Sequence, residues 1–169
     1  MVQAYNFLAS WQLFPEKCIF EHGLAPKSGN YKIESINNGH TLLISSNWVS
    51  IENEAFYTQH EIVPDATLRA FDNQILADTL FAEIPNASTL VTRFIKEEIT
   101  VLDVTHEILA NGYLKITQKG TKADSEAFTN IEIYHKQLSV MPYAASAAGV
   151  AIRPTKEGVI KHKALWAME

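Results

Sequence analysis

The segment from Glu98 to Gln137 alternates apolar and polar side chains, and this alternation most constrains what the chain can fold into. A repeat of two residues is typical of a β-strand, because successive side chains point to opposite faces of the sheet. Asn111-Gly112 interrupts the pattern and predicts a hairpin turn, since both residues tolerate a positive φ. The segment therefore predicts three long antiparallel strands. Their predicted core-facing residues are Thr100, Leu102, Val104, His106 and Ile108; Leu114, Ile116 and Gln118; and Ile131, Ile133 and His135.

Shorter stretches with the same period precede this segment. Strands are predicted at 7–14, 17–21, 31–36, 40–49, 56–63, 68–71, 75–84 and 88–96. Turn residues such as Asn37-Asn38-Gly39 and Pro64-Asp65 separate them, and Trp11 is an early apolar anchor. The chain up to residue 140 therefore reads as about ten strands at near-regular spacing, with no helical periodicity.

The short connections between successive strands favour an up-and-down antiparallel β-barrel over a sandwich, because strands adjacent in sequence then lie side by side. Closing the sheet also removes exposed strand edges. A barrel of about eight to ten strands is wide enough to keep a cavity at its centre. We therefore expect an all-β fold whose cavity holds a small ligand.

The sequence after residue 140 changes in character, which predicts a barrel over residues 1–140 and an extension over 141–169. Thr155 is a suitable helix N-cap and Glu157 follows in the first turn, so a helix is expected from Thr155 to Met168. We expect this extension to pack on the outside of the barrel. The alternatives are a plug over the barrel mouth and a subunit contact that would make a homodimer.

Composition narrows the classes of function. The chain has 169 residues, enough for one domain, and a net charge of −5 with both signs interspersed, which argues against nucleic acid as a partner. No apolar run approaches the roughly 18 residues that a membrane-spanning helix needs. The single Cys18 cannot form an internal disulfide, and with no signal-peptide pattern at the start we expect a cytoplasmic protein.

Three short motifs resemble a known superfamily. Residues 7–13, Phe-Leu-Ala-Ser-Trp-Gln-Leu, are similar to the opening Phe-x-Gly-Thr-Trp-x-Leu of the fatty-acid-binding branch of the calycins, the superfamily that also holds the lipocalins. Residues 105–108, followed by 111–114, resemble the Thr-Arg-Glu-Leu hairpin of that branch, and residues 133–136 resemble its closing Ile-Tyr-Glu-Lys. The resemblance spans residues 7–137 and implies a calycin barrel that carries a small, mainly apolar or amphipathic ligand.

The departures from that branch bear on the ligand. Its two arginines and one tyrosine grip a carboxylate, whereas the matching positions here hold His106, Glu132 and Tyr134. Without the arginines the bidentate recognition of a carboxylate is lost, which disfavours a simple fatty-acid carrier. The resemblance also implies that Glu132 and Tyr134 point inward, whereas strand alternation predicts that Ile133 and His135 do. A shift of one residue exchanges the two faces, and both alternatives stay open.

The predicted ligand contacts are polar or aromatic side chains on strand faces that could line the cavity. His60 and His106 share faces with apolar residues, and Arg93 shares its phase with Val91 and Ile95. The full set is His60, Arg93, His106, Tyr134, His135, Trp48 and Phe56.

No motif identifies a reaction or a cofactor. The six histidines show no compact metal-binding spacing, so no metal site is predicted. No catalytic residue can be named, because acid–base chemistry needs paired groups that the sequence does not bring together. The alternatives to a carrier are an enzyme on the same barrel, such as an isomerase or a chromophore lyase, and a haem protein. Haem enters because the nitrobindins, which are similar in architecture, bind it through one histidine; His106 or His135 would be that ligand here.

Overall fold

The computed structural model describes residues 4–138, which form one antiparallel sheet of ten strands. The strands are β1 (Ala9–Leu13), β2 (Pro26–Ile36), β3 (Thr41–Ser50), β4 (Ala55–Ile62), β5 (Arg69–Ala70), β6 (Thr79–Asn86), β7 (Thr89–Lys96), β8 (Ile99–Ile108), β9 (Leu114–Thr121) and β10 (Ala127–Lys136). Three short 3-10 turns accompany them: η1 (Ala4–Phe7), η2 (Pro15–Lys17) and η3 (Asn37–Gly39). The all-β prediction is confirmed. The predicted extension at 141–169, with its helix, lies outside the described residues.

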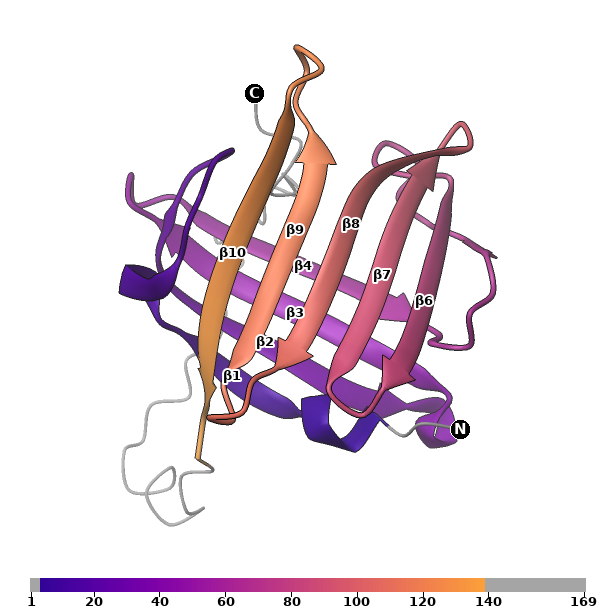
Figure 1. Ribbon diagram of the computed structural model, residues 1–169, viewed down its shortest axis with the longest axis horizontal. Coiled ribbons are helices and arrows are strands. Elements are labelled where there is room, and N and C mark those ends of the chain that lie inside the picture. Colours follow the sequence, from indigo (N-terminus) through magenta and orange to yellow (C-terminus); the bar gives the residue numbers. More distant parts are fainter. Residues whose placement is uncertain (1–3, 139–169) are drawn as a thin grey trace, which may run out of the picture.

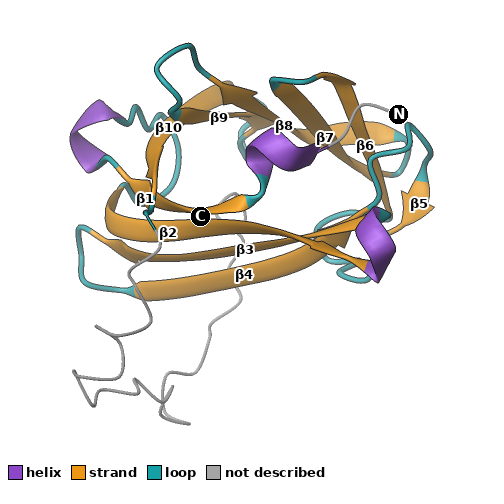
Figure 2. Cartoon of the chain, turned by 90° about the horizontal axis from the view of Figure 1, so that it is seen from below, coloured by secondary structure: helices purple, strands orange, loops and turns teal. Residues whose placement is uncertain are grey.

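The sheet curls so that its two halves face each other. Its strand order is β4-β3-β2-β1-β10-β9-β8-β7-β6-β5, so β1 pairs with β10 and every other pair is consecutive in sequence. Figures 1 and 2 show the result as two layers that cross at an angle, with β2 to β4 in one and β6 to β9 in the other. Up-and-down connectivity is confirmed.

Closure of the barrel is corrected, because no strand pairing joins β4 to β5 or β6 within residues 4–138. The molecule is a curled half-barrel with an opening at this point. Side chains span the opening between β4 and the opposite strands: the His60 ring on β4 meets the rings of Phe71 and Phe94 edge-on, with centroids 6.3 and 5.6 Å apart. Just after β4, one isolated backbone bridge joins Asp65 to Glu83 on β6. The longer segment between β4 and β6 contains only the two-residue β5, so the backbone pairing breaks here.

The three-stranded segment predicted from alternation is confirmed as β8, β9 and β10. Its first hairpin turns at Gly112, which has a φ of +82°. The Asn111 side chain accepts a hydrogen bond from the Tyr113 backbone N–H at 3.0 Å. The turn residues thus act as their types predict.

The inward face of β10 is the one implied by the resemblance and not the one predicted from alternation. Asn130, Glu132 and Tyr134 are buried, whereas Ile133 and His135 lie on the outer face and are only partly covered. Both faces of this strand carry apolar residues, so the sequence period alone does not distinguish them.

Two boundaries near the N-terminus also differ from the prediction. Residues 17–21 form no strand; Ile19 makes one isolated bridge to Ile131 on β10. β2 begins at Pro26 and runs through Gly29. A Cβ at Gly29 would lie 3.0 Å from that of Trp48, so glycine lets β2 and β3 approach here.

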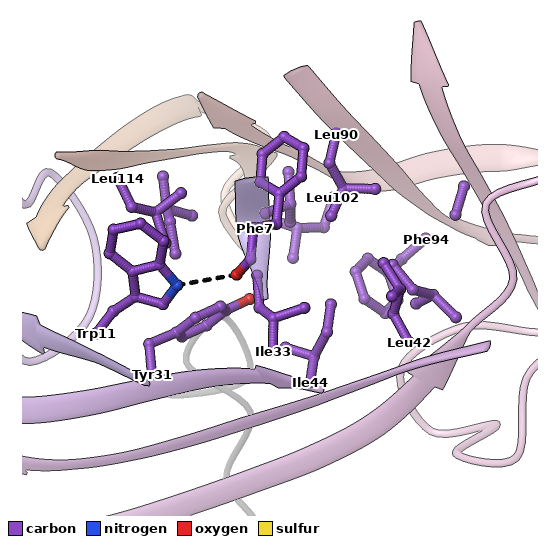
Figure 3. Packing of buried hydrophobic residues seen from close by; sticks show 14 of the residues in the cluster. Phe7, Trp11, Tyr31, Ile33, Leu42, Ile44, Leu90, Phe94, Leu102 and Leu114 are labelled. Atoms are coloured by element: carbon purple, nitrogen blue, oxygen red, sulfur yellow. Dashed lines mark hydrogen bonds between the residues drawn. The ribbon is translucent and has the colours of Figure 1, made fainter. Parts of the chain in front are cut away.

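The apolar core lies between the two layers (Figure 3). Phe7 from η1 is fully buried, and its carbonyl accepts a hydrogen bond from the Trp11 indole N–H at 3.1 Å. In Figure 3 the Phe7 ring lies beside Leu90 and Leu102. None of the helices within residues 4–138 is long and apolar enough to cross a membrane.

Candidate functional site

A cavity of about 460 Å³ lies between the layers beside this core. Its walls come from strands β2, β3, β4, β7, β8, β9 and β10 and from the segment after β5. The lining residues are Tyr31, Ile44, Ser46, Thr58, Gln59, His60, Phe71, Asp72, Asn73, Leu76, Thr92, Phe94, Val104, His106, Ile116, Gln118 and Glu132. Most of the wall surface is apolar, with polar groups placed among the apolar side chains, and this combination is typical of sites for small organic ligands.

Tyr31 and His106 form a buried pair in the cavity wall. The Tyr31 hydroxyl lies 2.7 Å from His106 Nε2, and the two ring centroids are 5.6 Å apart. Burial lowers the pKa of His106 to about 3, with the nearby His60 adding to the effect. Burial likewise lowers the pKa of His60 to about 4. Both imidazoles are therefore neutral at pH 7.

Glu132 lies in the same wall, on β10. Its Oε2 accepts a hydrogen bond from the Tyr134 hydroxyl, and its Oε1 accepts a long one, 3.5 Å, from Gln118 Nε2. Burial raises the pKa of Glu132 to about 7, against the opposing effect of the hydrogen bond from Tyr134. The ion pairs formed by the described residues do not include Glu132. A buried carboxyl without a cation is costly to ionise, which accounts for the direction of the shift.

Two polar atoms in the cavity wall lack hydrogen-bond partners. Thr92 Oγ1 and His106 Nδ1 are buried and make no hydrogen bond of ordinary geometry, although a backbone interaction with Leu90 opposes the fall in the pKa of His106. An unpaired buried polar group costs about 1–3 kcal/mol.

The structure brings three of the predicted site residues to this region. His60 and His106 line the cavity. Tyr134 is buried behind the lining and holds Glu132 through its hydroxyl. Burial and the neighbouring Glu132 raise the pKa of Tyr134, which keeps this hydroxyl a proton donor.

Arg93 and His135 point away from the cavity, and the prediction that they face inward is wrong. Arg93 Nε pairs with Asp103 Oδ2 on the outer face of β7 and β8 at 3.1 Å. The His135 ring packs against Phe14, with centroids 4.7 Å apart. In both strands the residues that alternate with these two are the buried ones, for example Thr92 in β7 and Tyr134 in β10. On the outer face the charged guanidinium group of Arg93 stays hydrated, which avoids the cost of burying it.

Trp48 and Phe56 are buried, but they do not line the cavity. Their rings stack with centroids 4.1 Å apart, and Phe20 and Leu24 pack against them in a separate small cluster. They face inward as predicted, yet the loop after η2 covers them. The prediction that they contact the ligand is therefore not supported by their position.

Several cavity residues were not predicted as contacts. Gln118 and Thr92 have ordinary strand positions, and Tyr31 was assigned only to a strand. The signal that could have found them is the position of large apolar residues along each strand. Thr92 lies on the same face of β7 as Leu90 and Phe94, and this face is buried. The segment from Phe71 to Leu76 gave no signal, because it reaches the cavity only through tertiary contacts.

The residues from 4 to 138 contain no cluster of three or more histidine, cysteine or acidic side chains placed to hold a metal ion. His106 Nε2 is engaged by the Tyr31 hydroxyl, and His135 lies outside the cavity. A haem in the cavity would therefore have to displace Tyr31 from His106 Nε2, and it could not be reached by His135.

Solved structures share this fold at low sequence identity. The wild-type fluorescent protein UnaG aligns with a TM-score of 0.57 and 11% identity, over 80% of this chain and 100% of its own. A point mutant of UnaG aligns with a TM-score of 0.55 and 11% identity, over 77% and 95% of the two chains. No protein-family model and no curated protein sequence matches. With its single curled antiparallel sheet of ten strands, the chain has a calycin-like fold.

Proposed function

We propose that the protein binds a small, mainly apolar ligand in the cavity between its two layers. The observation that carries this proposal is the preformed cavity of about 460 Å³, walled by apolar side chains such as Ile44, Val104 and Ile116. Polar side chains in the same wall, among them Gln118 and Glu132, would orient the ligand. The calycin-like fold is consistent with this proposal, because the curled sheet that it shares with UnaG leaves space for a cavity between the two layers.

Burial of apolar surface would drive binding. Each 100 Å² of apolar ligand surface removed from water contributes on the order of 2.5 kcal/mol. Because the walls are already formed, the protein loses little conformational entropy when the ligand enters. The single Cys18 is consistent with a carrier in the reducing cytoplasm.

Fluorescence titration with a neutral, environment-sensitive apolar dye tests the proposal. We expect saturable binding to one site, and competition by material extracted from the natively purified protein and identified by mass spectrometry. Thr58→Trp places a large ring in the cavity wall, and it should weaken dye affinity by about tenfold or more. Thr117→Trp, on the outer face of β9, is the matched control and should leave affinity unchanged.

Equal dye affinity in both tryptophan variants would contradict the cavity as the site. Absence of saturable dye binding together with absence of any extractable small molecule would contradict the function itself. Both readouts need only the folded protein.

The enzyme alternative gains no support from the chain's thiol. Cys18 donates a hydrogen bond to the Phe14 carbonyl at 3.2 Å. Burial raises the pKa of Cys18 to about 11, so the reactive thiolate is scarce at pH 7. Ligand binding therefore remains the function that the geometry supports best.

A further inference from the structure

Within the part of the chain that the structure describes, the cavity is lined by acids and neutral groups, and by none of the basic side chains that would attract an anion. Among its lining residues the titratable side chains are Asp72, Glu132, His60, His106 and Tyr31; none is lysine or arginine. Arg93, the one arginine predicted to face inward, is paired with Asp103 outside. The field inside the cavity is therefore neutral to negative, which disfavours a carboxylate or sulfonate ligand.

Glu132 is the buried acid of this cavity, and it has no cationic partner among residues 4–138. The side chain is 4% exposed. The groups that face it are the Tyr31 hydroxyl from β2, the Gln118 amide from β9, the Tyr134 hydroxyl from its own strand and the Cys18 thiol from the segment after η2. All four are neutral. The contact with Gln118 is long, at 3.5 Å, so Oε1 keeps the capacity to accept a stronger hydrogen bond.

We propose that Glu132 is the anchor for a basic nitrogen, so that the ligand is a small apolar molecule carrying one amine or amidine group. This inference rests on the ligand-binding function proposed above and specifies its ligand class. The cation would lie against Oε1 of Glu132, and the apolar body of the ligand would lie along Ile116, Val104 and Phe94. A buried carboxylate gains most from a charge-assisted hydrogen bond when both ions are shielded from water.

A cation in this position would change the protonation of Glu132. The free protein holds this carboxyl partly protonated at neutral pH, because burial raises its pKa to about 7. A bound ammonium group favours the ionised form, so binding near pH 7 releases a proton from Glu132. His60 and His106 remain neutral over this range and do not repel the incoming cation.

Three probes of similar shape test the inference: 2-naphthylmethylamine, 2-naphthylmethanol and 2-naphthoic acid, titrated by calorimetry into the whole chain at about pH 7.5. We expect the amine to bind about tenfold or more tightly than the alcohol, and the acid to bind most weakly. Repeating the amine titration in buffers of different ionisation enthalpy should reveal release of a fraction of a proton. The alcohol should release none.

Glu132→Gln should remove the preference for the amine and leave the affinity for the alcohol nearly unchanged. Glutamine resembles the protonated acid in shape, so the variant is expected to fold. Glu107→Gln, on the outer face of β8 where the carboxylate pairs with Lys115, is the matched control. Asp72→Asn tests the other acid of the cavity and should reduce the preference far less than Glu132→Gln.

Equal affinities for amine and alcohol, tighter binding of the acid, or an amine preference that survives in Glu132→Gln would overturn the inference. So would loss of the preference in Asp72→Asn alone. If Glu132→Gln failed to fold, proton release by the wild-type chain would still decide. Binding of the alcohol without an amine preference would refute the amine class and leave the ligand-binding function standing, whereas failure of all three probes and of the neutral dye would refute both.

Discussion

At the scale of single residues, the buried acid Glu132 and the buried histidines His60 and His106 make the stability of the protein depend on pH in opposite directions. The pKa of Glu132 rises on folding from 4.5 to about 7, so its contribution is present below pH 4.5 and is lost as pH rises through about 7. The pKa values of His60 and His106 fall from 6.5 to about 4 and about 3, so their contribution is present above pH 6.5 and is lost as pH falls. Between pH 4.5 and 6.5 the two histidines outweigh the one acid, so the combined contribution of these three groups to stability rises with pH.

The first prediction concerns Glu132→Gln and stability. Wild type loses stability as pH rises because Glu132 is hard to ionise when buried, and the glutamine variant has no such loss. The free energy of unfolding of the variant minus that of wild type should therefore increase by up to about 3 kcal/mol from about pH 4.5 to pH 7.5. Urea unfolding at several pH values measures this difference. A constant difference across the range would show that Glu132 has an ordinary pKa in the folded protein.

The second prediction concerns the Tyr31 hydroxyl. Tyr31→Phe removes the hydrogen bond to His106 Nε2 and leaves that nitrogen of a buried imidazole without its partner. We expect a loss of about 1–3 kcal/mol in the free energy of unfolding, measured in urea. Tyr57→Phe, at a partly exposed position on β4, is the control and should cost less than about 0.5 kcal/mol. A loss in the control as large as that in Tyr31→Phe would contradict the assigned role of the hydrogen bond.

At the scale of elements, one side chain on β10 holds the loop between β1 and β2. Asn130 Oδ1 accepts hydrogen bonds from the backbone N–H groups of Glu21 and His22 at 2.9 and 3.1 Å, and its Nδ2 donates to the His22 carbonyl at 2.9 Å. Asn130 is 1% exposed, so these bonds are shielded from water. The loop replaces the strand predicted at 17–21, and side-chain bonds here take the place of strand pairing.

The third prediction follows from these contacts. Asn130→Ala should lower the free energy of unfolding by on the order of 3 kcal/mol and speed amide hydrogen exchange at residues 20–24. Asn47→Ala, which removes an exposed asparagine from β3, is the control for both measurements. Unchanged exchange at Glu21 and His22 would show that the loop is held by other contacts.

At the scale of the whole molecule, the opening beside β4 is the feature that governs access to the cavity. The rings of His60, Phe71 and Phe94 meet across it, and Phe71 and Phe94 lie edge-on at 5.4 Å. The cavity lining continues into this region through Asp72, Asn73 and Leu76. Side chains can move faster than paired strands, which makes this the expected route of ligand entry.

The fourth prediction tests this route. Phe71→Ala should raise the dissociation rate of a bound apolar dye by about tenfold, because it removes the side chain that closes the opening. Leu68→Ala, at an exposed position on the same segment, is the control and should leave the rate unchanged. Stopped-flow displacement of the dye measures both. A Phe71→Ala rate equal to that of wild type would place entry elsewhere.

Much of the fold follows from local sequence patterns. Alternation over 98–137 and the Asn-Gly turns predicted β8 to β10 and their order, because strand period and turn geometry are set by neighbouring residues. The inward positions of His60 and His106 also followed, since each shares its phase with large apolar side chains. The outward positions of Arg93 and His135 could not be predicted, because their strands carry apolar residues on both faces. The two-residue period then does not show which face is buried.

The sequence by itself determined that the chain forms an antiparallel series of strands with short connections, and it placed most of the turns. Only the tertiary structure decided that the sheet stays open beside β4, and that Glu132 is buried among Tyr31, Gln118 and Tyr134 with no cation from residues 4–138 beside it. The reason is physical: strand formation depends on residues adjacent in the chain, whereas closure of the sheet and the pKa of a buried acid depend on groups that only the folded sheet brings together.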